Sequence, residues 1–439
     1  MSGRPILLIL LDGVADRTCS ELGDLTPLEA AATPNLDRIA AGGVSGFVYP
    51  IEPGLVPPSE LPHFHLFGYA PYPFPGRAVL EALGHGVGVP MDAVVTHAGL
   101  RHVTPTAAGF EIAHWWPRDE DDDCAALVAS VSSFESDGVT VSLRFLGRSD
   151  SLLTLHGGSE DVTDSDPFFF TRLPAIRVEP LAGARDPGAA SRTARALNRY
   201  LLWTRDVLEG HPVNAGRRAR GAHPMNMLLT KWTGRRRPLP PFVRRAGVEG
   251  TIIASTPIYA GFAALLGMRY VDVPEYVDDP EKEVAEKLRA AREALEAGAG
   301  FVHLHTKAAD EAAHAHSPVT KRNVIEAIDR GLAELAAPWA QDVVVAVTAD
   351  HATPSQGPML HTGDSVPLAV SAPTVRRDAV TTFGERPAVA GGLGQLRARD
   401  VLPILLNAAD RARFLGSRPT PDAGLGVPRV TPLRPEDVE

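Results

Sequence analysis

The chain has 439 residues, with 44% hydrophobic residues, 22% charged residues and a formal net charge of −10 at pH 7. This length and composition predict a globular protein with two or three domains, or with one large core that carries an insertion. The negative charge argues against nucleic acid or an anionic membrane as the main partner, and no apolar run is long enough to span a membrane.

The N-terminal run Pro5–Leu11 is apolar, but it is too short for a membrane span and ends at Asp12 and Gly13 without a signal-peptide cleavage site. We interpret it as a buried strand. Cys19 and Cys124 are far apart in the chain and belong to no metal-binding motif. So few thiols in a long chain are typical of a reducing compartment, and we expect the protein to be cytoplasmic.

Two helix starts are predicted after the first strand. Thr26 and Thr33 each precede a proline, which is typical of an N-cap followed by the first helical residue. Residues 53–62 then form a proline-rich loop that we expect to be rigid, and this loop carries Ser59 and Glu60. Most serines in such loops are only turn residues. Ser59 is therefore a candidate site residue only because of the residues that surround it in the fold.

The middle of the chain has a different composition. Between residues 92 and 187, short β-type runs alternate with polar loops, including the acidic run 119–123, which we interpret as a solvated loop. We therefore expect a smaller α+β domain at 92–187, inserted into a core that consists of residues 1–91 and 188–439. We expect this insertion to act as a mobile cap that closes over a substrate.

Strands and helices alternate in the second half of the chain. This order predicts an α/β core with a doubly wound, mainly parallel sheet. The predicted strands are 251–254, 270–273, 301–305 and 343–349, and the predicted helices are 189–209, 258–266 and 280–298.

The segment between residues 217 and 237 is the most basic stretch of this acidic protein. Its cationic residues are Arg217, Arg218, Arg220, Lys231 and Arg235, Arg236 and Arg237. Two interpretations are open, a solvated surface and a site that captures a phosphate or a carboxylate.

Two residues of the kinds that bind metals, Asp350 and His351, follow the apolar strand 343–349. Ligands of α/β proteins bind just beyond the carboxyl ends of such strands. Asp310 and His314 are four residues apart, so on a helix they would share one face and form half of a metal site.

Asp12 at the end of the first strand and His361, ten residues after His351, complete the candidate ligand set. Its number and type suit two divalent cations rather than one. Histidine and carboxylate ligands together suit Mn²⁺ or Zn²⁺ better than Ca²⁺, and Mg²⁺ is a further candidate.

Short motifs along almost the whole chain also carry a resemblance to a known family. They are Leu11-Asp12-Gly13, Thr26–Ala31, Thr33–Asp37, Ser59-Glu60, Gly68-Tyr69, His211–Asn214, Lys307 with Asp310–Ala312 and His314, Thr348–Pro354, and His361–Asp364 with Val366–Leu368. In these motifs the chain resembles the archaeal-type branch of the cofactor-independent phosphoglycerate mutases, in the alkaline phosphatase superfamily.

The resemblance implies a cytoplasmic glycolytic isomerase with two divalent metal ions, which interconverts 3-phosphoglycerate and 2-phosphoglycerate through a phosphoserine. It implies that Ser59 is the nucleophile and that Lys307 helps to hold the phosphate. It assigns one cation to Asp310, His314 and His361, and the other to Asp12, Ser59, Asp350 and His351. A bound cation lowers the pKa of a serine hydroxyl and stabilises the charge of phosphoryl transfer.

The chain departs from the family pattern in places. The nucleophile motif is Pro57-Pro58-Ser59-Glu60 rather than Pro-Gly-Ser-Asp, and Lys231 stands where an arginine is expected. Lysine lacks the bidentate fork of arginine. We expect Arg77, Arg217 and Lys231 to bind the substrate, a small phosphorylated metabolite.

Three hypotheses about function remain open at this point. The first is a phosphoglycerate mutase, or a paralogue with an altered substrate. The second is a metal-dependent phosphatase or phosphotransferase that acts on another small phosphorylated or phosphonate metabolite. The third is a binding protein without catalytic activity, which the intact ligand set disfavours because unpaired buried ligands are costly.

Overall fold

The computed structural model describes residues 3–114, 121–167, 174–421, 423–428 and 430–438. The chain divides into two compact units: unit 1 consists of Met1–Phe74 and Leu239–Glu439, and unit 2 consists of Pro75–Pro238. Unit 2 extends beyond the expected insertion at 92–187 at both ends. It does so because α4 (Arg77–Gly84) and strand β8 (Met227–Arg235) pack against or pair with strand β3 (Val94–Thr106).

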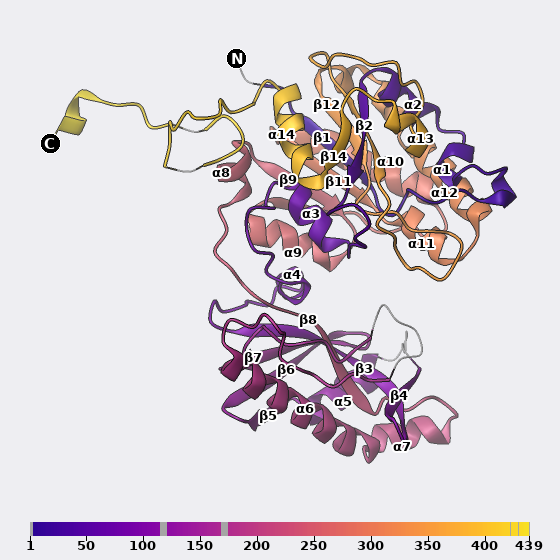
Figure 1. Cartoon of the computed structure of the whole chain (residues 1–439), viewed down its shortest axis with the longest axis vertical. Helices are drawn as coiled ribbons and strands as arrows, with labels where there is room; N and C mark the ends of the chain where they lie inside the picture. The colour runs from indigo at the N-terminus through magenta and orange to yellow at the C-terminus, as the bar shows by residue number, and fades with distance from the viewer. Residues whose placement is uncertain (1–2, 115–120, 168–173, 422, 429, 439) are drawn as a thin grey trace. The chain divides into compact units, whose positions relative to one another are not determined.

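Among the residues described, unit 1 is built on an eight-stranded sheet with the order β10-β9-β11-β1-β12-β13-β2-β14 (Figure 1). Neighbouring strands are parallel except where β13 pairs with β12 and β2. The strands are β1 (Ile6–Leu11), β2 (Val44–Tyr49), β9 (Gly250–Ala254), β10 (Arg269–Asp272), β11 (Phe301–Thr306), β12 (Val344–Thr348), β13 (Val366–Ser371) and β14 (Gly394–Arg397).

The helices of unit 1 pack around this sheet. Helix α10 packs on α12 and on strands β9 and β11, and α14 packs on α3 and on β12 and β14. The helices are α1 (Pro27–Ala30), α2 (Pro34–Ala41), α3 (Glu60–Leu66), α8 (Phe242–Ala246), α9 (Pro257–Leu266), α10 (Pro280–Glu296), α11 (Ala308–His314), α12 (Pro318–Gly331), α13 (Glu385–Val389) and α14 (Ala398–Ala408), with 3-10 turns η1 (Ser20–Leu22), η2 (Ala333–Ala336), η3 (Pro338–Asp342) and η4 (Pro435–Val438).

The three central parallel strands β11, β1 and β12 are buried along their whole length. This explains why β1 and β12 are almost entirely apolar, since helices cover both faces of a parallel sheet, whereas β11 also buries His303 and His305. The predicted fold class, an α/β protein with a mainly parallel sheet and a second α+β region, is therefore confirmed. In-register pairing also places the carboxyl ends of these three strands side by side.

Unit 2 is built on an antiparallel sheet with the order β4-β3-β7-β6-β5, and β8 also pairs with β3. Its remaining strands are β4 (Gly109–His114), β5 (Ser133–Ser136), β6 (Val139–Gly147) and β7 (Asp150–His156). Its remaining helices are α5 (Asp121–Ser130), α6 (Pro187–Glu209) and α7 (Pro212–Ala219).

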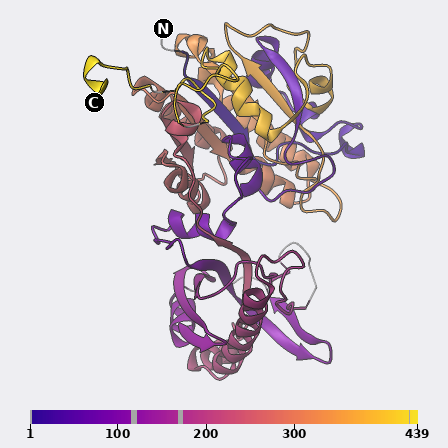
Figure 2. The same cartoon turned by 60° about the vertical axis from the view of Figure 1, so that its left-hand side comes forward.

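Helix α6 supplies one side of the unit 2 core. Its buried residues, among them Leu197, Tyr200 and Leu201, pack with apolar side chains of the sheet, and the helix contacts β8, β5 and β6 (Figure 2). The core also buries an ion pair between Arg101 and Asp166, whose nearest atoms are 2.7 Å apart. Both side chains are fully buried, so this pair is a constraint on the fold rather than a surface contact.

Some local predictions need correction. The predicted loop 53–62 ends earlier, because α3 begins at Glu60 with Ser59 at the N-cap position and includes Pro62. After the predicted helix 189–209, His211 begins a further helix, because its ring nitrogen accepts a hydrogen bond from the Val213 amide and caps α7. Of the acidic run 119–123, residues 119 and 120 lie outside the described residues, and the run continues into α5.

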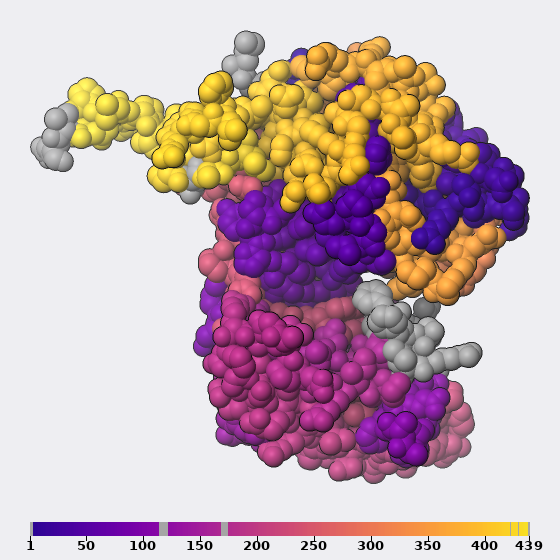
Figure 3. All heavy atoms as spheres, viewed as in Figure 1, coloured from indigo at the N-terminus to yellow at the C-terminus, as the bar shows by residue number. Residues whose placement is uncertain are grey.

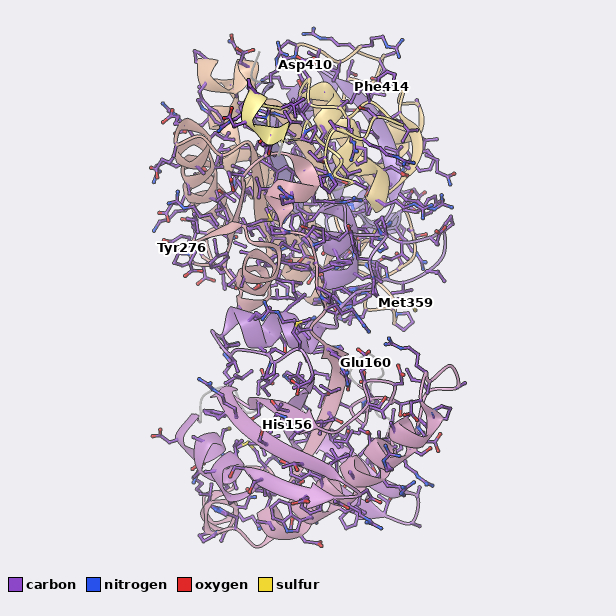
Figure 4. All side chains as sticks on the ribbon, turned by 90° about the vertical axis from the view of Figure 1, so that its left-hand side faces the viewer. His156, Glu160, Tyr276, Met359, Asp410 and Phe414 are labelled. Atoms are coloured by element: carbon purple, nitrogen blue, oxygen red, sulfur yellow. The ribbon has the colours of Figure 1, made fainter. Side chains whose placement is uncertain are left out.

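The last part of unit 1 follows α14 at the surface, in yellow in Figure 3. Its side chains include Phe414, labelled in Figure 4, which is 83% exposed. Among the helices described, none is both long and apolar enough to cross a membrane. Cys19 and Cys124 are buried and free of disulfide bonds.

The two threonines that precede prolines provide a test of helix capping. The Thr26 hydroxyl accepts from the Glu29 amide at 3.0 Å and donates to Glu385 at 2.8 Å, whereas the Thr33 side chain makes no cap hydrogen bond. We expect Thr26→Ala to lower the free energy of unfolding by about 1 kcal/mol or more. The matched variant Thr33→Ala should lower it less, because it removes no cap hydrogen bond and only a long one, of 3.4 Å, from the Thr33 hydroxyl to Asp37. Urea unfolding of both variants would measure the difference, and equal losses would contradict the assignment.

Candidate metal centre

The chemistry-bearing residues of unit 1 gather where β11, β1 and β12 end. Asp12 directly follows β1, and Asp350 and His351 follow β12. After β11 the chain enters α11, which carries Asp310 and His314 one turn apart. Parallel strands that are neighbours in a sheet end at the same edge, and this is what brings these side chains together.

The first group of potential ligands consists of Asp310, His314 and His361. Nε2 of His314 lies 3.3 Å from Asp310 Oδ1, and Nε2 of His361 lies 3.7 Å from the same oxygen. Asp310 and His361 are buried, whereas the His314 side chain is 35% exposed. This group contains the three residues assigned to one cation in the sequence analysis.

The second group consists of Asp12, Asp310 and His351, so Asp310 is common to both groups. Nε2 of His351 lies 3.3 Å from Asp12 Oδ1 and 3.4 Å from Asp350 Oδ2. Among the described residues, the buried oxygens Asp12 Oδ1 and Asp350 Oδ2 have no hydrogen-bond partner. Buried carboxylate oxygens without a partner are costly, and a cation bound here would satisfy them.

Ser59 joins this group from the start of α3. Its Oγ lies 3.0 Å from Nε2 of His351, and its backbone carbonyl accepts a hydrogen bond of 2.7 Å from Nδ1 of the buried His63. The bond to His63 holds the first turn of α3, so the Ser59 hydroxyl is directed at the ligand cluster rather than at solvent.

The electrostatics of the cluster are those of crowded carboxylates. Burial, followed by repulsion from Asp310, raises the pKa of Asp350 to about 7. Burial, followed by repulsion from Asp350 and Asp310, raises the pKa of Asp12 well above its usual value. Burial also lowers the pKa of His351, which keeps its imidazole neutral. Neutral imidazoles and close carboxylates are the donor set that a divalent transition-metal ion binds, so the residues fit such ions.

Lys307 precedes α11, and its Nζ lies 3.9 Å from Asp310 Oδ2. The side chain is 39% exposed, so the ammonium group can reach both the cluster and solvent. An ammonium group beside a metal cluster can bind a phosphate as a point charge.

Four residues of the cluster were not singled out in the sequence. His305 Nε2 lies 3.2 Å from Asp12 Oδ2 and 2.6 Å from the Tyr259 hydroxyl, and Thr353 contacts Asp310 and His351. His63 is the fourth. A usable signal existed for His305, because it lies near the carboxyl end of a buried strand, and for Thr353, which lies two residues after His351 within the motif Thr348–Pro354. Tyr259 is brought in by another segment and carries no local signal.

The three predicted substrate-binding residues all lie in unit 2, and only two of them share a neighbour. The Arg77 guanidinium lies 3.8 Å and the Lys231 Nζ 4.0 Å from the centroid of the Trp232 ring. Arg217 lies on α7, where it pairs with Asp123 at 2.9 Å and donates to the His223 carbonyl at 2.7 Å. The structure thus places Arg217 among different contacts from Arg77 and Lys231.

The positive charge of Lys231 already has an acidic partner within unit 2, Asp166. Its Nζ lies 3.8 Å from Asp166, which also pairs with Arg101, and burial lowers the pKa of Lys231 to about 8. Trp232 has a φ of 62°, in the left-handed region that a bulky residue rarely adopts. This buried, compensated lysine differs from an open anion-binding site.

A family model described as the Metalloenzyme superfamily matches residues 4–408 of the chain. The chain is 34% identical to 2,3-bisphosphoglycerate-independent phosphoglycerate mutase 2 of Methanocaldococcus jannaschii, over 94% of this chain and 95% of the relative. It is 35% identical to the 2,3-bisphosphoglycerate-independent phosphoglycerate mutase of Methanopyrus kandleri, over 94% of this chain and 98% of the relative.

Two solved structures are similar over almost the whole chain. The PH0037 protein from Pyrococcus horikoshii has a TM-score of 0.76 and 29% identity, covering 95% of this chain and 100% of that one. The cofactor-independent phosphoglycerate mutase from Thermoplasma acidophilum has a TM-score of 0.63 and 28% identity, covering 92% and 100%. Both units of this chain therefore have counterparts in known structures.

The shared position of Asp310 leads to a test by metal content. We expect Asp310→Ala to lose metal at both groups, His314→Ala to weaken only the first group, and His316→Ala to change nothing. His316 is the matched control because it is two residues from His314 and belongs to neither ligand group found among the described residues. Elemental analysis after dialysis against Mn²⁺ would measure this, and equal metal content in Asp310→Ala and wild type would refute the site.

Metal should also stabilise the folded protein, since an ion that binds only the folded state shifts the unfolding equilibrium. At a free concentration one hundred times the Kd, each site should add about 2.7 kcal/mol to the free energy of unfolding. Thermal unfolding with Mn²⁺ and with a chelator would show a higher Tm with metal. An unchanged Tm at saturating Mn²⁺ would contradict this expectation.

Proposed function

Because the chain belongs to the archaeal-type 2,3-bisphosphoglycerate-independent phosphoglycerate mutase family of the metalloenzyme superfamily, we propose that it moves a phosphoryl group between two hydroxyls of one small metabolite through Ser59. The observation that carries the proposal is the Ser59 hydroxyl 3.0 Å from His351 Nε2, within the cluster that holds both ligand groups. The proposed reaction is the interconversion of 3-phosphoglycerate and 2-phosphoglycerate, because the relatives named above are mutases of this kind.

Two divalent cations, Mn²⁺ or Zn²⁺ with Mg²⁺ as a further candidate, would be held by the clustered residues. Asp310, His314 and His361 would hold one cation. Asp12, Asp350 and His351, with Ser59 and the shared Asp310, would hold the other. Bound there, the cations would supply Lewis-acid stabilisation for the serine oxygen and for the phosphoryl oxygens.

The residues of the chain then have separate tasks. Ser59 Oγ attacks phosphorus, the bond from phosphorus to the substrate oxygen breaks, and that oxygen takes up a proton. The second hydroxyl of the bound glycerate attacks the phosphoserine and loses its proton, and Ser59 Oγ leaves and is protonated again. Lys307 would hold the phosphoryl oxygens during both steps, because its ammonium group lies beside Asp310 yet remains partly exposed.

Unit 2 is proposed to carry substrate-recognition residues, as the insertion was expected to do. Arg77 and Lys231 are supported by their common contact with Trp232. Arg217 is the least supported of the three, since it is 3% exposed and already pairs with Asp123.

The second candidate is hydrolysis or transfer of the phosphoryl group of another small phosphorylated or phosphonate metabolite. One observation favours this candidate: Lys231 is buried against the Trp232 ring and already has an ionic partner, Asp166. Isomerisation needs a site that keeps water from the phosphoserine, whereas hydrolysis admits it. Incubation of the Mn²⁺-loaded protein with 3-phosphoglycerate, with 2-phosphoglycerate and free phosphate both quantified, separates the two. Phosphate without 2-phosphoglycerate would favour the second candidate.

Removal of the Ser59 hydroxyl tests the covalent step. We expect Ser59→Ala to lower turnover at least about a thousandfold, because the attacking atom is missing, while metal at Asp310, His314 and His361 is retained. The exposed Ser417→Ala is the control and should keep wild-type turnover. Mass spectrometry of wild type trapped with substrate should show phosphate on the peptide that contains Ser59. Full turnover in Ser59→Ala would eliminate the mechanism.

A further inference from the structure

The side chain of Thr353 contacts two residues of the second ligand group, Asp310 and His351. Thr353 follows β12 and is fully buried. Its Oγ1 lies 2.8 Å from Asp310 Oδ1 and 3.0 Å from His351 Nδ1. One hydroxyl therefore contacts the carboxylate that both groups share and a histidine of the second group.

The hydrogen-bond roles of this hydroxyl follow from what each partner can do. An ionised carboxylate can only accept, so the single hydroxyl proton of Thr353 goes to Asp310. The oxygen of Thr353 must then accept from His351, which places the imidazole proton on Nδ1. We propose that Thr353 is a positioning residue that fixes His351 in the Nδ1–H tautomer and ties the two ligand groups together.

The tautomer decides what the other ring nitrogen can do. With the proton on Nδ1, Nε2 presents a lone pair, and it lies 3.0 Å from Ser59 Oγ and 3.3 Å from Asp12 Oδ1. A lone pair there can bind a cation or accept the Ser59 proton, whereas an Nε2–H group can do neither. The Thr353 hydroxyl, which contacts no reacting atom, thus determines whether His351 Nε2 presents a lone pair to the reacting atoms.

The backbone of Thr353 is itself held on two sides. Its amide donates to the Ala15 carbonyl at 3.0 Å, and its carbonyl accepts from Nζ of Lys321 at 2.7 Å. Lys321 is fully buried on α12 and also donates to Asp16 and to the Ala15 carbonyl, each at 3.1 Å. The segments after β1 and after β12 are therefore joined through one buried ammonium group, which leaves Thr353 little freedom to move.

Gly13 leaves room for the hydroxyl. A Cβ at this position would lie 2.4 Å from Thr353 Oγ1 and 2.9 Å from Asp310 Oδ1, closer than van der Waals contact permits. The φ of Gly13 is also positive, at 61°. A side chain at position 13 is thus excluded by space as well as by backbone conformation, and the Thr353–Asp310 hydrogen bond occupies the space that it would need.

The effect on turnover rests on the proposed function, but the tautomer does not. The primary test is ¹⁵N NMR of the imidazoles in the metal-free whole protein, with His351 assigned by comparison with His351→Gln. We expect wild type to show protonated Nδ1 and unprotonated Nε2. Protonated Nε2 in wild type would overturn the proposal without any Thr353 variant, and whatever substrate the enzyme uses.

The variant test compares Thr353→Val, which keeps the shape but lacks the hydroxyl, with Thr353→Ser, which keeps the hydroxyl. Loss of such an outer contact typically weakens metal binding about 10–100-fold, so we expect that loss for Mn²⁺ in Thr353→Val and near wild-type affinity in Thr353→Ser. With an active substrate, kcat should fall in Thr353→Val while KM changes little.

The outcomes separate the two proposals. If Thr353→Val keeps both the Nδ1–H tautomer and the wild-type Mn²⁺ affinity, Thr353 has no positioning role. If Thr353→Ser is as impaired as Thr353→Val, the effect comes from packing and the proposal also fails. If wild type has no mutase activity but the NMR and Mn²⁺ results are as expected, only the proposed function is lost.

Discussion

Three buried carboxylates at one edge of a sheet impose the main constraint on this protein. Asp12, Asp310 and Asp350 are almost completely buried and close enough to raise the pKa values of Asp12 and Asp350. Taking like charges out of water together is unfavourable unless positive charge or protons compensate them. Burial lowers the pKa values of His63, His305, His351 and His361, so these imidazoles do not supply the positive charge. Divalent cations are the compensation that suits the site chemically.

The rest of unit 1 can be understood as the support that this cluster requires. Strands β1 and β12 are apolar up to their carboxyl ends, and β11 carries buried histidines at His303 and His305 as well as Thr306 at its end. Behind the ligands lie further hydrogen bonds, from His305 to Asp12 and from Thr353 to Asp310. Such contacts restrict the orientation of each carboxylate, which lowers the cost of arranging them when a cation binds.

Unit 2 follows a different physical plan. Its antiparallel sheet buries one face against α6, and its charged residues are paired within the unit, as in Arg101 with Asp166. Lys231 lies next to the same carboxylate, and Trp232 adopts a left-handed backbone conformation beside it. Strain of this kind persists only where the surrounding structure enforces it.

The sequence by itself determined the α/β class and most of the ligand set, because these depend on local patterns: apolar strands that end in Asp12 or Asp350, and an i, i+4 pair on one helix. Only the tertiary structure decided that Asp310 is common to both groups, that the Thr353 hydroxyl contacts it and that unit 2 includes β8. Each of these depends on strand order and register between segments far apart in the chain. Periodicity shows which face of an element is buried, but it does not show which distant side chain will meet it there.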